Sequence, residues 1–270
     1  MLTPKQHLTI ARHAQRPTCA DFVNGLCTDF FPQCGDRLCA EDEAIFGGIA
    51  RFRGRPVTVI GTQKGKNLEE NLRYRFGMPT PEGYRKALRM MKQAEKFNRP
   101  ILTFIDTPGA YPGLEAEQRG QGEAIARNLL EMSQLQVPVI AIITGEGNSG
   151  GALALGVGNR VFMLEHAVYS VLSPEGFATI LWKDSARQED ACNLMKLTAQ
   201  DLLEQRVIDG IIPEPIGGAH LDYPQMMSTL SDIIANELGD LCKLKPHVLA
   251  QKRYDKFRQM GNHVLTKEGA

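Results

Sequence analysis

The amino-acid sequence predicts an α/β protein with a central sheet that is covered by helices on both faces. Residues 100–105 and 137–144 are continuous apolar runs, which is typical of strands buried on both sides. Segments with helical periodicity separate these runs, as expected when helices pack on the faces of a sheet. Strand-like runs also occur in adjacent pairs, which does not fit a simple alternation of one strand and one helix. These pairs are residues 44–52 with 56–63, and residues 161–164 with 168–172.

Composition and charge indicate an ordinary globular protein. Of its 270 residues, 43% are hydrophobic and 23% are charged. The balance of 31 Lys and Arg against 31 Asp and Glu argues against a nucleic-acid binder, which usually has a basic excess. We find no apolar run of about 18 residues and no secretory signal at the start of the sequence, so we expect a cytoplasmic protein without a membrane partner.

The six cysteines predict reduced thiols rather than a metal centre. Four of them, Cys19, Cys27, Cys34 and Cys39, lie close together in the sequence. Their gaps are irregular and contain no CxxC pair, which does not match the usual spacing of zinc ligands. We therefore expect no metal on this chain.

Capping residues locate the helices. Residues 1–40 look helical and polar, with Thr18 and Asp21 placed as a capping box. Thr80 followed by Pro81 predicts a helix start, and so does Ser173 followed by proline. Further helices are expected over residues 117–134, over residues 149–157, and over most of the chain after residue 190.

The stretch Gly-Glu-Gly-Asn-Ser-Gly-Gly-Ala at residues 145–152 matches three different signatures. Gly145, Gly147 and Gly150 fit the dinucleotide fingerprint, with Glu165 at the distance of a ribose-binding acid. The same stretch fits a nucleophile elbow centred on Ser149. Asp209 and His220 follow Ser149 in the order of a hydrolase triad.

The third interpretation needs no catalytic side chain. A glycine-rich turn that leads into a helix presents unpaired backbone N–H groups and the positive end of the helix dipole. Such a site can stabilise an oxyanion or an enolate. A tight turn that needs glycine only for packing is the structural alternative.

Longer motifs distinguish between these interpretations. FGMPTPEGYRKALRMMKQAEKFNRPI, IDTPGAYPG, RGQGEAIARNL, GEGNSGGALALGVGNRV and YSVLSPEGFATILWKD follow one another along the chain. Together they closely resemble the carboxyltransferase alpha subunit of bacterial acetyl-CoA carboxylase. The resemblance extends from about residue 10 to residue 240 without a break, so it is far more specific than any short motif.

The resemblance implies a crotonase fold, a ClpP/crotonase-like superhelix of repeated ββα units with helical N- and C-terminal extensions. We place the extensions at residues 1–40 and 241–270 and the carboxyltransferase domain at residues 41–240. The implied reaction moves the carboxyl group of carboxybiotin to acetyl-CoA and gives malonyl-CoA, the first committed step of fatty acid biosynthesis.

The resemblance also implies the partners. The biotin is attached to a biotin carboxyl carrier protein and not to this chain, and a separate biotin carboxylase uses ATP. The alpha subunit works with a beta subunit in an alpha2beta2 assembly, with the active site at the interface between them. A non-catalytic scaffold of the crotonase group is the rival interpretation, and the intact glycine motifs speak against it.

Carried onto this sequence, the resemblance assigns backbone donors rather than catalytic side chains. Gly150 and Gly151 match the glycines at the helix start, and Gly109 or Ala110 in the TPGAYPG loop is the expected second donor. Asn148 stands where the family usually has glycine, and we expect it to adopt a positive φ.

Residues 64–99 carry an excess of basic side chains over acidic ones. This pattern suggests a face for the phosphates of coenzyme A or for an acidic partner, and a solvated helix face is the alternative. The candidate substrate-binding residues are Lys64, Lys66, Arg73 and Arg85. The tail from Lys243 to Lys267 is also basic.

Overall fold

The computed structural model describes residues 2–262, and within this range eight strands form one mixed sheet. The strand order is β1-β2-β3-β4-β5-β6-β8, and β7 pairs with the end of β5. The strands from β3 to β8 run parallel, whereas β1, β2 and β3 form an antiparallel meander. The strands are β1 Cys27–Pro32, β2 Ile45–Phe52, β3 Arg55–Thr62, β4 Ile101–Thr107, β5 Val139–Asn148, β6 Arg160–Leu164, β7 Val168–Ser170 and β8 Gly210–Ile212.

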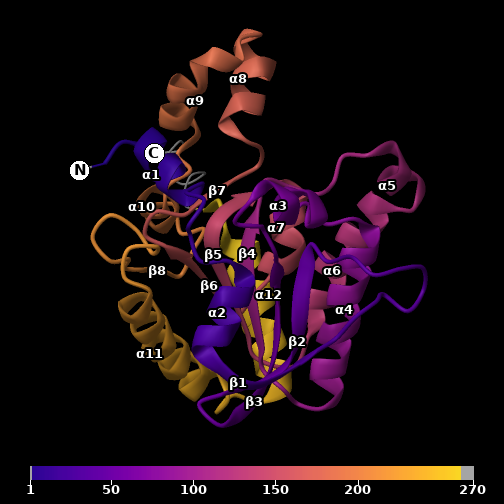
Figure 1. Cartoon of the computed structure of the whole chain (residues 1–270). Helices are drawn as coiled ribbons and strands as arrows, with labels where there is room; N and C mark the ends of the chain where they lie inside the picture. The colour runs from indigo at the N-terminus through magenta and orange to yellow at the C-terminus, as the bar shows by residue number, and fades with distance from the viewer. Residues whose placement is uncertain (1, 263–270) are drawn as a thin grey trace.

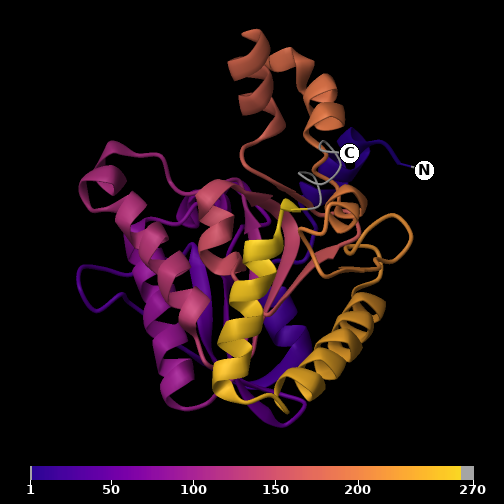
Figure 2. The ribbon, with the colours of Figure 1, turned by 180° about the vertical axis from the view of Figure 1, so that it is seen from behind.

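Helices cover both faces of the sheet, as the apolar strand runs predicted (Figures 1 and 2). The helices α4 Pro81–Lys96, α6 Gln121–Gln134, α7 Ser149–Gly156 and α12 Pro246–Gln259 pack together on one face. Two others, α2 Cys19–Leu26 and α11 Tyr223–Leu241, pack on the opposite face. Every residue of β4 and β5 is buried, because these two central strands are covered on both sides.

The prediction that residues 1–40 are helical is wrong in part. Thr3 and Thr18 are the N-cap residues of the helices α1 Pro4–Ala11 and α2, and the expected capping box of Thr18 and Asp21 is present. Residues 27–32 instead form the edge strand β1, paired antiparallel with β2. The strand is irregular, with a register shift after Thr28, so its sequence lacks the alternation that identifies a strand.

Other predicted boundaries shift slightly. The helix expected over residues 117–134 is broken into α5 Leu114–Gln118 and α6, because Gly120 adopts φ +86° between them. Pro81 begins α4 as expected, but the Thr80 side chain does not cap the helix. Its hydroxyl donates to the buried Asp42 carboxylate at 2.9 Å instead. Ser173 does cap α8 Pro174–Trp182, accepting from the N–H of Gly176 at 3.2 Å.

The helices α8 and α9 Gln188–Met195 form a hairpin that projects beyond the end of the sheet (Figure 1). Between them lies the short 3-10 turn η2 Ser185–Arg187. The remaining elements are α3 Leu68–Arg73, the 3-10 turn η1 Arg75–Gly77 and α10 Ala199–Glu204. Among the described residues, no helix combines the length and apolar character needed to cross a membrane.

The final helix is fixed by a buried arginine. Arg253 of α12 is fully buried and donates hydrogen bonds to the carbonyl oxygens of Met132, Leu135 and Val137. It also contacts the side chain of Asn159, which precedes β6. Arg253 therefore ties α12 to backbone carbonyl groups in the last turn of α6 and in the segment that follows it. The last part of the predicted basic tail, residues 263–270, lies outside the described residues.

Candidate active site

The candidate site lies where β4 and β5, two parallel neighbours, reach their carboxyl ends. The TPGAYPG loop leaves β4, and α7 leaves β5. In an open sheet with parallel strands, ligands bind at this edge because the loops there diverge. The sheet therefore brings together the two segments that the sequence singled out.

The start of α7 exposes backbone N–H groups. Asn148 is the N-cap residue, and its side chain makes no capping bond. It accepts instead from the Ser170 hydroxyl at 2.9 Å. The first N–H groups of α7 have no acceptor within the helix, and they are free to bind an anionic oxygen.

The expectation of a positive φ at Asn148 is wrong. Asn148 has φ −111°, and the positive φ falls on the next residue, Ser149, at +62°. The chain therefore makes its sharp turn one residue later than the sequence predicts. Such a conformation is unfavourable for a residue with a side chain, so the surrounding structure holds it in place.

The TPGAYPG loop presents a free donor close to the start of α7. The Thr107 hydroxyl accepts from the Gly109 N–H at 3.0 Å and donates to the Gly109 carbonyl oxygen at 2.8 Å. Gly109 has φ +139°, which only glycine adopts readily. Within residues 2–262, the N–H of the next residue, Ala110, has no hydrogen-bond partner. Of the two expected donors, the geometry therefore favours Ala110.

The loop and the helix start are in close contact. A β-carbon added to Gly151 would lie 2.5 Å from the Ala110 nitrogen, 2.7 Å from the Gly109 carbonyl carbon and 2.8 Å from the Tyr84 hydroxyl. Glycine is therefore required at position 151 by space. A β-carbon on Gly150 would meet only the Ile125 side chain, at 3.3 Å.

Tyr84 is a site residue that the sequence did not reveal. Its side chain is fully buried below Gly151, and its hydroxyl has no hydrogen-bond partner in the described part of the chain. Burial raises the pKa of this phenol, so it stays protonated. In the sequence, Tyr84 is only one apolar position in the repeat of α4.

Two pockets open beside Ser149, and Ser149 lines both. The first, of about 410 Å³, lies between the TPGAYPG loop, α6 and Ser173. The second, of about 440 Å³, is lined mainly by apolar side chains, among them Leu153, Val171 and Phe257, and includes Gly150. The helix start thus lies where a small organic group can reach it from either side.

A buried ion-pair network joins the two strand ends. The Lys64 ammonium lies 2.7 Å from an Asp106 carboxylate oxygen on β4 and 3.0 Å from a Glu146 oxygen on β5. Asp106 also accepts from the backbone N–H of Glu146 at 2.8 Å. Lys64 therefore links the strand that leads into the TPGAYPG loop with the strand that leads into α7.

The charges in this network stabilise one another. Burial alone raises the pKa of Glu146, but Lys64 and Arg12 outweigh it, so the net shift is downward. Burial likewise lowers the pKa of Lys64, but Asp106 and Glu146 outweigh it and the net shift is upward. The charged forms of Glu146 and Lys64 are therefore favoured. Arg12 extends the network, since it bonds to Glu146 at 2.8 Å and to Glu175 of α8.

The four basic side chains that the sequence predicts as substrate-binding do not meet at one site, and they do not share a partner. Lys66 pairs with Asp21 at 2.8 Å, Arg73 with Glu43 at 2.7 Å and Arg85 with Asp36 at 2.9 Å. Lys64 alone contacts the strand ends below the glycines. The sequence did contain a signal for Asp106 and Glu146: Asp106 directly follows the apolar run of residues 100–105, and Glu146 follows the run of residues 137–144 after one glycine.

The structure contradicts the other two interpretations of residues 145–152. Gly145 and Gly147 lie inside β5 and not in a loop, so they cannot form the turn of a dinucleotide site. The partners expected of a nucleophilic Ser149 are elsewhere: Asp209 pairs with Lys256 at 2.8 Å, and His220 stacks on His13. Ser149 makes no side-chain hydrogen bond within the described range, so no base activates it.

No cysteine is among the residues that line the two pockets beside Ser149. All six cysteines are free thiols, and Cys19 and Cys192 are buried. Among residues 2–262, no group of three His, Cys, Asp or Glu side chains is arranged to hold a metal ion.

Sequence comparisons show which proteins the chain is similar to over nearly its whole length. A family model described as acetyl co-enzyme A carboxylase carboxyltransferase-like matches residues 1–261. The acetyl-coenzyme A carboxylase carboxyl transferase subunit alpha of Geobacillus sp. (strain WCH70) is 57% identical over 267 residues, covering 99% of this chain and 82% of that protein. The corresponding subunit of Alkaliphilus oremlandii (strain OhILAs) is 57% identical over 260 residues, covering 96% and 82%.

Solved structures show the same fold. A transcarboxylase 12S structure, with methylmalonyl-coenzyme A and methylmalonic acid bound, has a TM-score of 0.71 at 18% identity. The alignment covers 90% of this chain and 46% of that one. A Pseudomonas malonate decarboxylase hetero-tetramer in complex with coenzyme A has a TM-score of 0.66 at 14% identity, covering 84% and 91%. The expected crotonase-like fold is confirmed.

Proposed function

The chain belongs to the family of the acetyl-coenzyme A carboxylase carboxyl transferase alpha subunit, and on this premise we propose how its glycine site promotes carboxyl transfer. The helix start at Gly150 and Gly151 and the loop at Gly109 and Ala110 form the two sides of an oxyanion site. Carboxybiotin, on a separate carrier protein, supplies the carboxyl group, and acetyl-CoA accepts it to give malonyl-CoA. This chain contributes position and electrostatic stabilisation.

One observation carries this proposal: the close contact between Gly151 and Ala110. This contact brings the backbone nitrogen of Ala110 close to the first turn of α7, which supports a site with donors from both segments. Donors from two separate segments thus lie side by side at the rim of two pockets. An oxygen that gains negative charge there is stabilised by donors that are already oriented before the reaction.

Lys64 acts in this proposal as a positioning residue. Its two ion pairs fix the ends of β4 and β5 relative to each other, and thereby fix the separation of the two donor segments. The sequence-based expectation that it binds phosphates of coenzyme A fits less well, because both of its carboxylate partners are in this chain. Phosphate binding by Lys66, Arg73 and Arg85 stays a prediction.

The family implies a beta subunit as partner, and the surface supports a partner at the α8–α9 hairpin. Several large apolar side chains there are exposed, and large exposed apolar patches usually mark protein interfaces. They are Ile180 and Leu181 of α8, Leu194 of α9, and Val171 in the segment that leads into α8. We propose that the hairpin contacts the beta subunit in an alpha2beta2 assembly, which receives carboxybiotin from the carrier protein of the larger complex. Binding of the carrier protein and of the biotin carboxylase, and location in the cytoplasm, stay predictions.

Co-purification with a beta subunit from a related bacterium tests this function. The complex is assayed for malonyl-CoA formed from carboxybiotin and acetyl-CoA, beside each subunit alone. We expect activity only in the complex, because the chain supplies no catalytic side chain of its own. Carboxyl transfer by the isolated chain would contradict the proposed shared site. The double variant Ile180→Ser/Leu181→Ser tests the proposed interface. It should weaken assembly with the beta subunit and leave the fold of this chain intact.

A further inference from the structure

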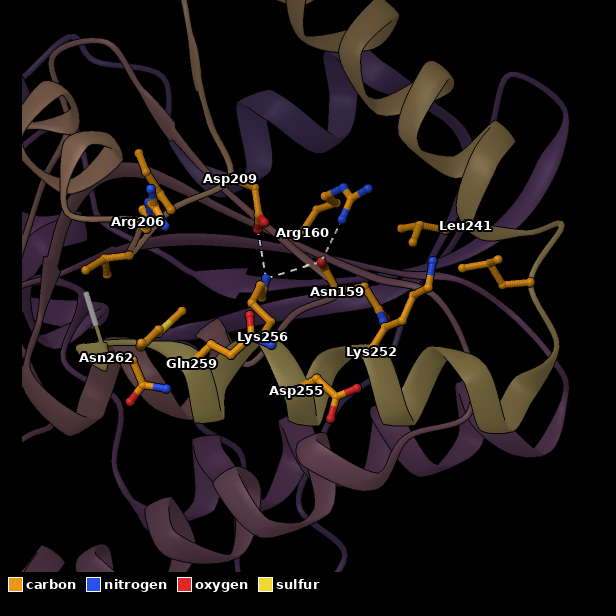
Figure 3. A pocket seen from close by; sticks show the side chains of 14 residues that line it. Asn159, Arg160, Arg206, Asp209, Leu241, Lys252, Asp255, Lys256, Gln259 and Asn262 are labelled. Carbon is orange, nitrogen blue, oxygen red and sulfur yellow. Dashed lines mark hydrogen bonds and ion pairs between the residues drawn. The ribbon is translucent and has the colours of Figure 1, made fainter. Parts of the chain in front are cut away.

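A large pocket lies between α12 and the segments around β6 and β8 (Figure 3). Its volume is about 710 Å³. Four basic side chains from three separate parts of the chain line it: Arg160, Arg206, Lys252 and Lys256. Two carboxylates, Asp209 and Asp255, also line it, so the formal charge of the lining is positive.

Two of the four cations are neutralised within the protein. Lys256 reaches from α12 to Asp209 at 2.8 Å and to the Asn159 carbonyl oxygen at 3.2 Å, as Figure 3 shows. Arg160 pairs with Glu237 of α11 at 2.7 Å. The Asp209 carboxylate also accepts a hydrogen bond from the backbone N–H of Val161 at 2.7 Å.

The other two cations have no counter-charge. In the described part of the chain, the side chains of Arg206 and Lys252 make no ion pair and no hydrogen bond. They approach the pocket from the end of α10 and from α12. The remaining carboxylate, Asp255, accepts a hydrogen bond from the Gln251 amide at 2.8 Å.

Buried charge behind the pocket adds to its positive potential. Arg253 is fully buried, and its hydrogen-bond acceptors are carbonyl and amide oxygens rather than carboxylates. Burial lowers the pKa of Arg253 to about 10 and also lowers that of Lys256, to which Arg160 and Arg253 contribute by repulsion. An anion in the pocket would relieve this repulsion.

We propose that this pocket binds a diphosphate group, as carried by a nucleotide or by a coenzyme A ester. The two unpaired cations match the charge of such a group, and guanidinium and ammonium are the side chains that commonly bind phosphate oxygens. The volume is sufficient for a nucleotide-sized ligand. Binding at this site does not depend on the oxyanion proposal.

The pocket borders the candidate active site. Val207 and Met260 line both this pocket and the apolar pocket that includes Gly150. A ligand in the basic pocket would therefore contact the same wall as a group in the apolar pocket. A ligand in one pocket can therefore affect ligand binding in the other.

Titration calorimetry on the full chain tests the proposal with three probes: inorganic pyrophosphate, ADP and coenzyme A. We expect saturable binding that weakens by about tenfold or more in the double variant Arg206→Ala/Lys252→Ala, since the unpaired cations supply the charge-assisted bonds. Lys243→Ala is the matched control, because Lys243 is an exposed lysine that pairs with Asp240 outside the pocket. It should bind as the wild type does.

The probes distinguish the sources of the diphosphate. Equal binding of all three would mean that the diphosphate alone is recognised, and tighter binding of ADP or coenzyme A would identify the ester that fits. Absence of binding by all three at millimolar concentration, or unchanged affinity in the double variant, would overturn the proposal. So would binding of coenzyme A without ADP or pyrophosphate. Circular dichroism checks that both variants, whose changed side chains are exposed, remain folded.

Discussion

The backbone nitrogen of Ala110 lies 2.5 Å from the place where a β-carbon of Gly151 would stand. These two residues are far apart in the sequence, yet they form one contact between the loop after β4 and the helix after β5. Real β-carbons do not approach other atoms this closely, so any side chain at position 151 pushes the two segments apart. The separation of the proposed donors therefore depends on a single missing methyl group.

Gly151→Ala should reduce carboxyl transfer by the assembled enzyme on the order of 100-fold or more, because loss of one aligned oxyanion donor has that effect. Gly150→Ala is the control. Its β-carbon meets only Ile125 at 3.3 Å, so activity should stay near that of the wild type. Steady-state rates of malonyl-CoA formation by the two variants test this prediction. Equal rates would argue against a role for the contact between Gly151 and Ala110. Gly151→Pro is a less clean test, because it adds the same β-carbon while it removes the N–H.

Ser149→Ala should retain most of the activity, because no base contacts its hydroxyl and its side chain does not cap α7. Ser149→Gly should stabilise the protein by about 1 kcal/mol, since glycine relieves the cost of the positive φ. Chemical denaturation measures the second effect and the carboxyl-transfer assay the first. An inactive but folded Ser149→Ala enzyme would restore the nucleophile interpretation.

Lys64→Met should destabilise the fold by about 3 kcal/mol, because Asp106 loses its counter-charge and Glu146 keeps only Arg12. If Lys64 positions the donor segments, kcat falls and the KM for acetyl-CoA changes little. If Lys64 binds phosphates of the substrate, KM rises instead. Lys64→Arg keeps the charge and should recover part of kcat. Lys66→Met is the control, since exposed ion pairs contribute only about 0–1 kcal/mol.

The stability of the chain should fall on mild acidification because of His7. Its imidazole is buried and faces the His166 ring, with Nδ1 atoms 3.1 Å apart. Burial, and then His166, lower the pKa of His7, although Glu165 and Glu214 oppose the shift. The neutral form is thus favoured in the folded state. Its contribution is complete above the unfolded pKa of about 6.5 and is lost as the pH falls through the lower folded pKa.

Urea unfolding at pH 7.5 and at pH 5.5 checks this expectation. Wild-type protein should lose more stability between the two than His7→Gln, which cannot take up the proton. The comparison with the variant is needed because His220, beside His13, also has a lowered pKa. Its protonation therefore also lowers the free energy of unfolding as the pH falls. An identical pH dependence in both proteins would show that His7 does not titrate in this range.

The sequence predicts the central strands and the helix starts well, because continuous apolar runs and capping residues are local signals. It identifies the glycines of the site through the long resemblance. It does not reveal β1, whose register shift removes the alternation, or the positive φ of Ser149, which tertiary contacts impose. The partners of Lys64 also depend on the fold, since Asp106 and Glu146 meet only when β4 and β5 pair.

The contacts of Arg253 make the final packing of this protein depend on a helix that is synthesised late. During synthesis, α6 and the strands beside it are made well before α12, and until α12 is made the carbonyl groups of Met132, Leu135 and Val137 lack the donor that the finished fold gives them. Until α12 has been synthesised, one face of the sheet lacks a helix that covers it in the finished fold. A chain that stops before residue 246 would contain β1 to β8 but lack α12. The carbonyl groups of Met132, Leu135 and Val137 would then have no hydrogen bond from Arg253.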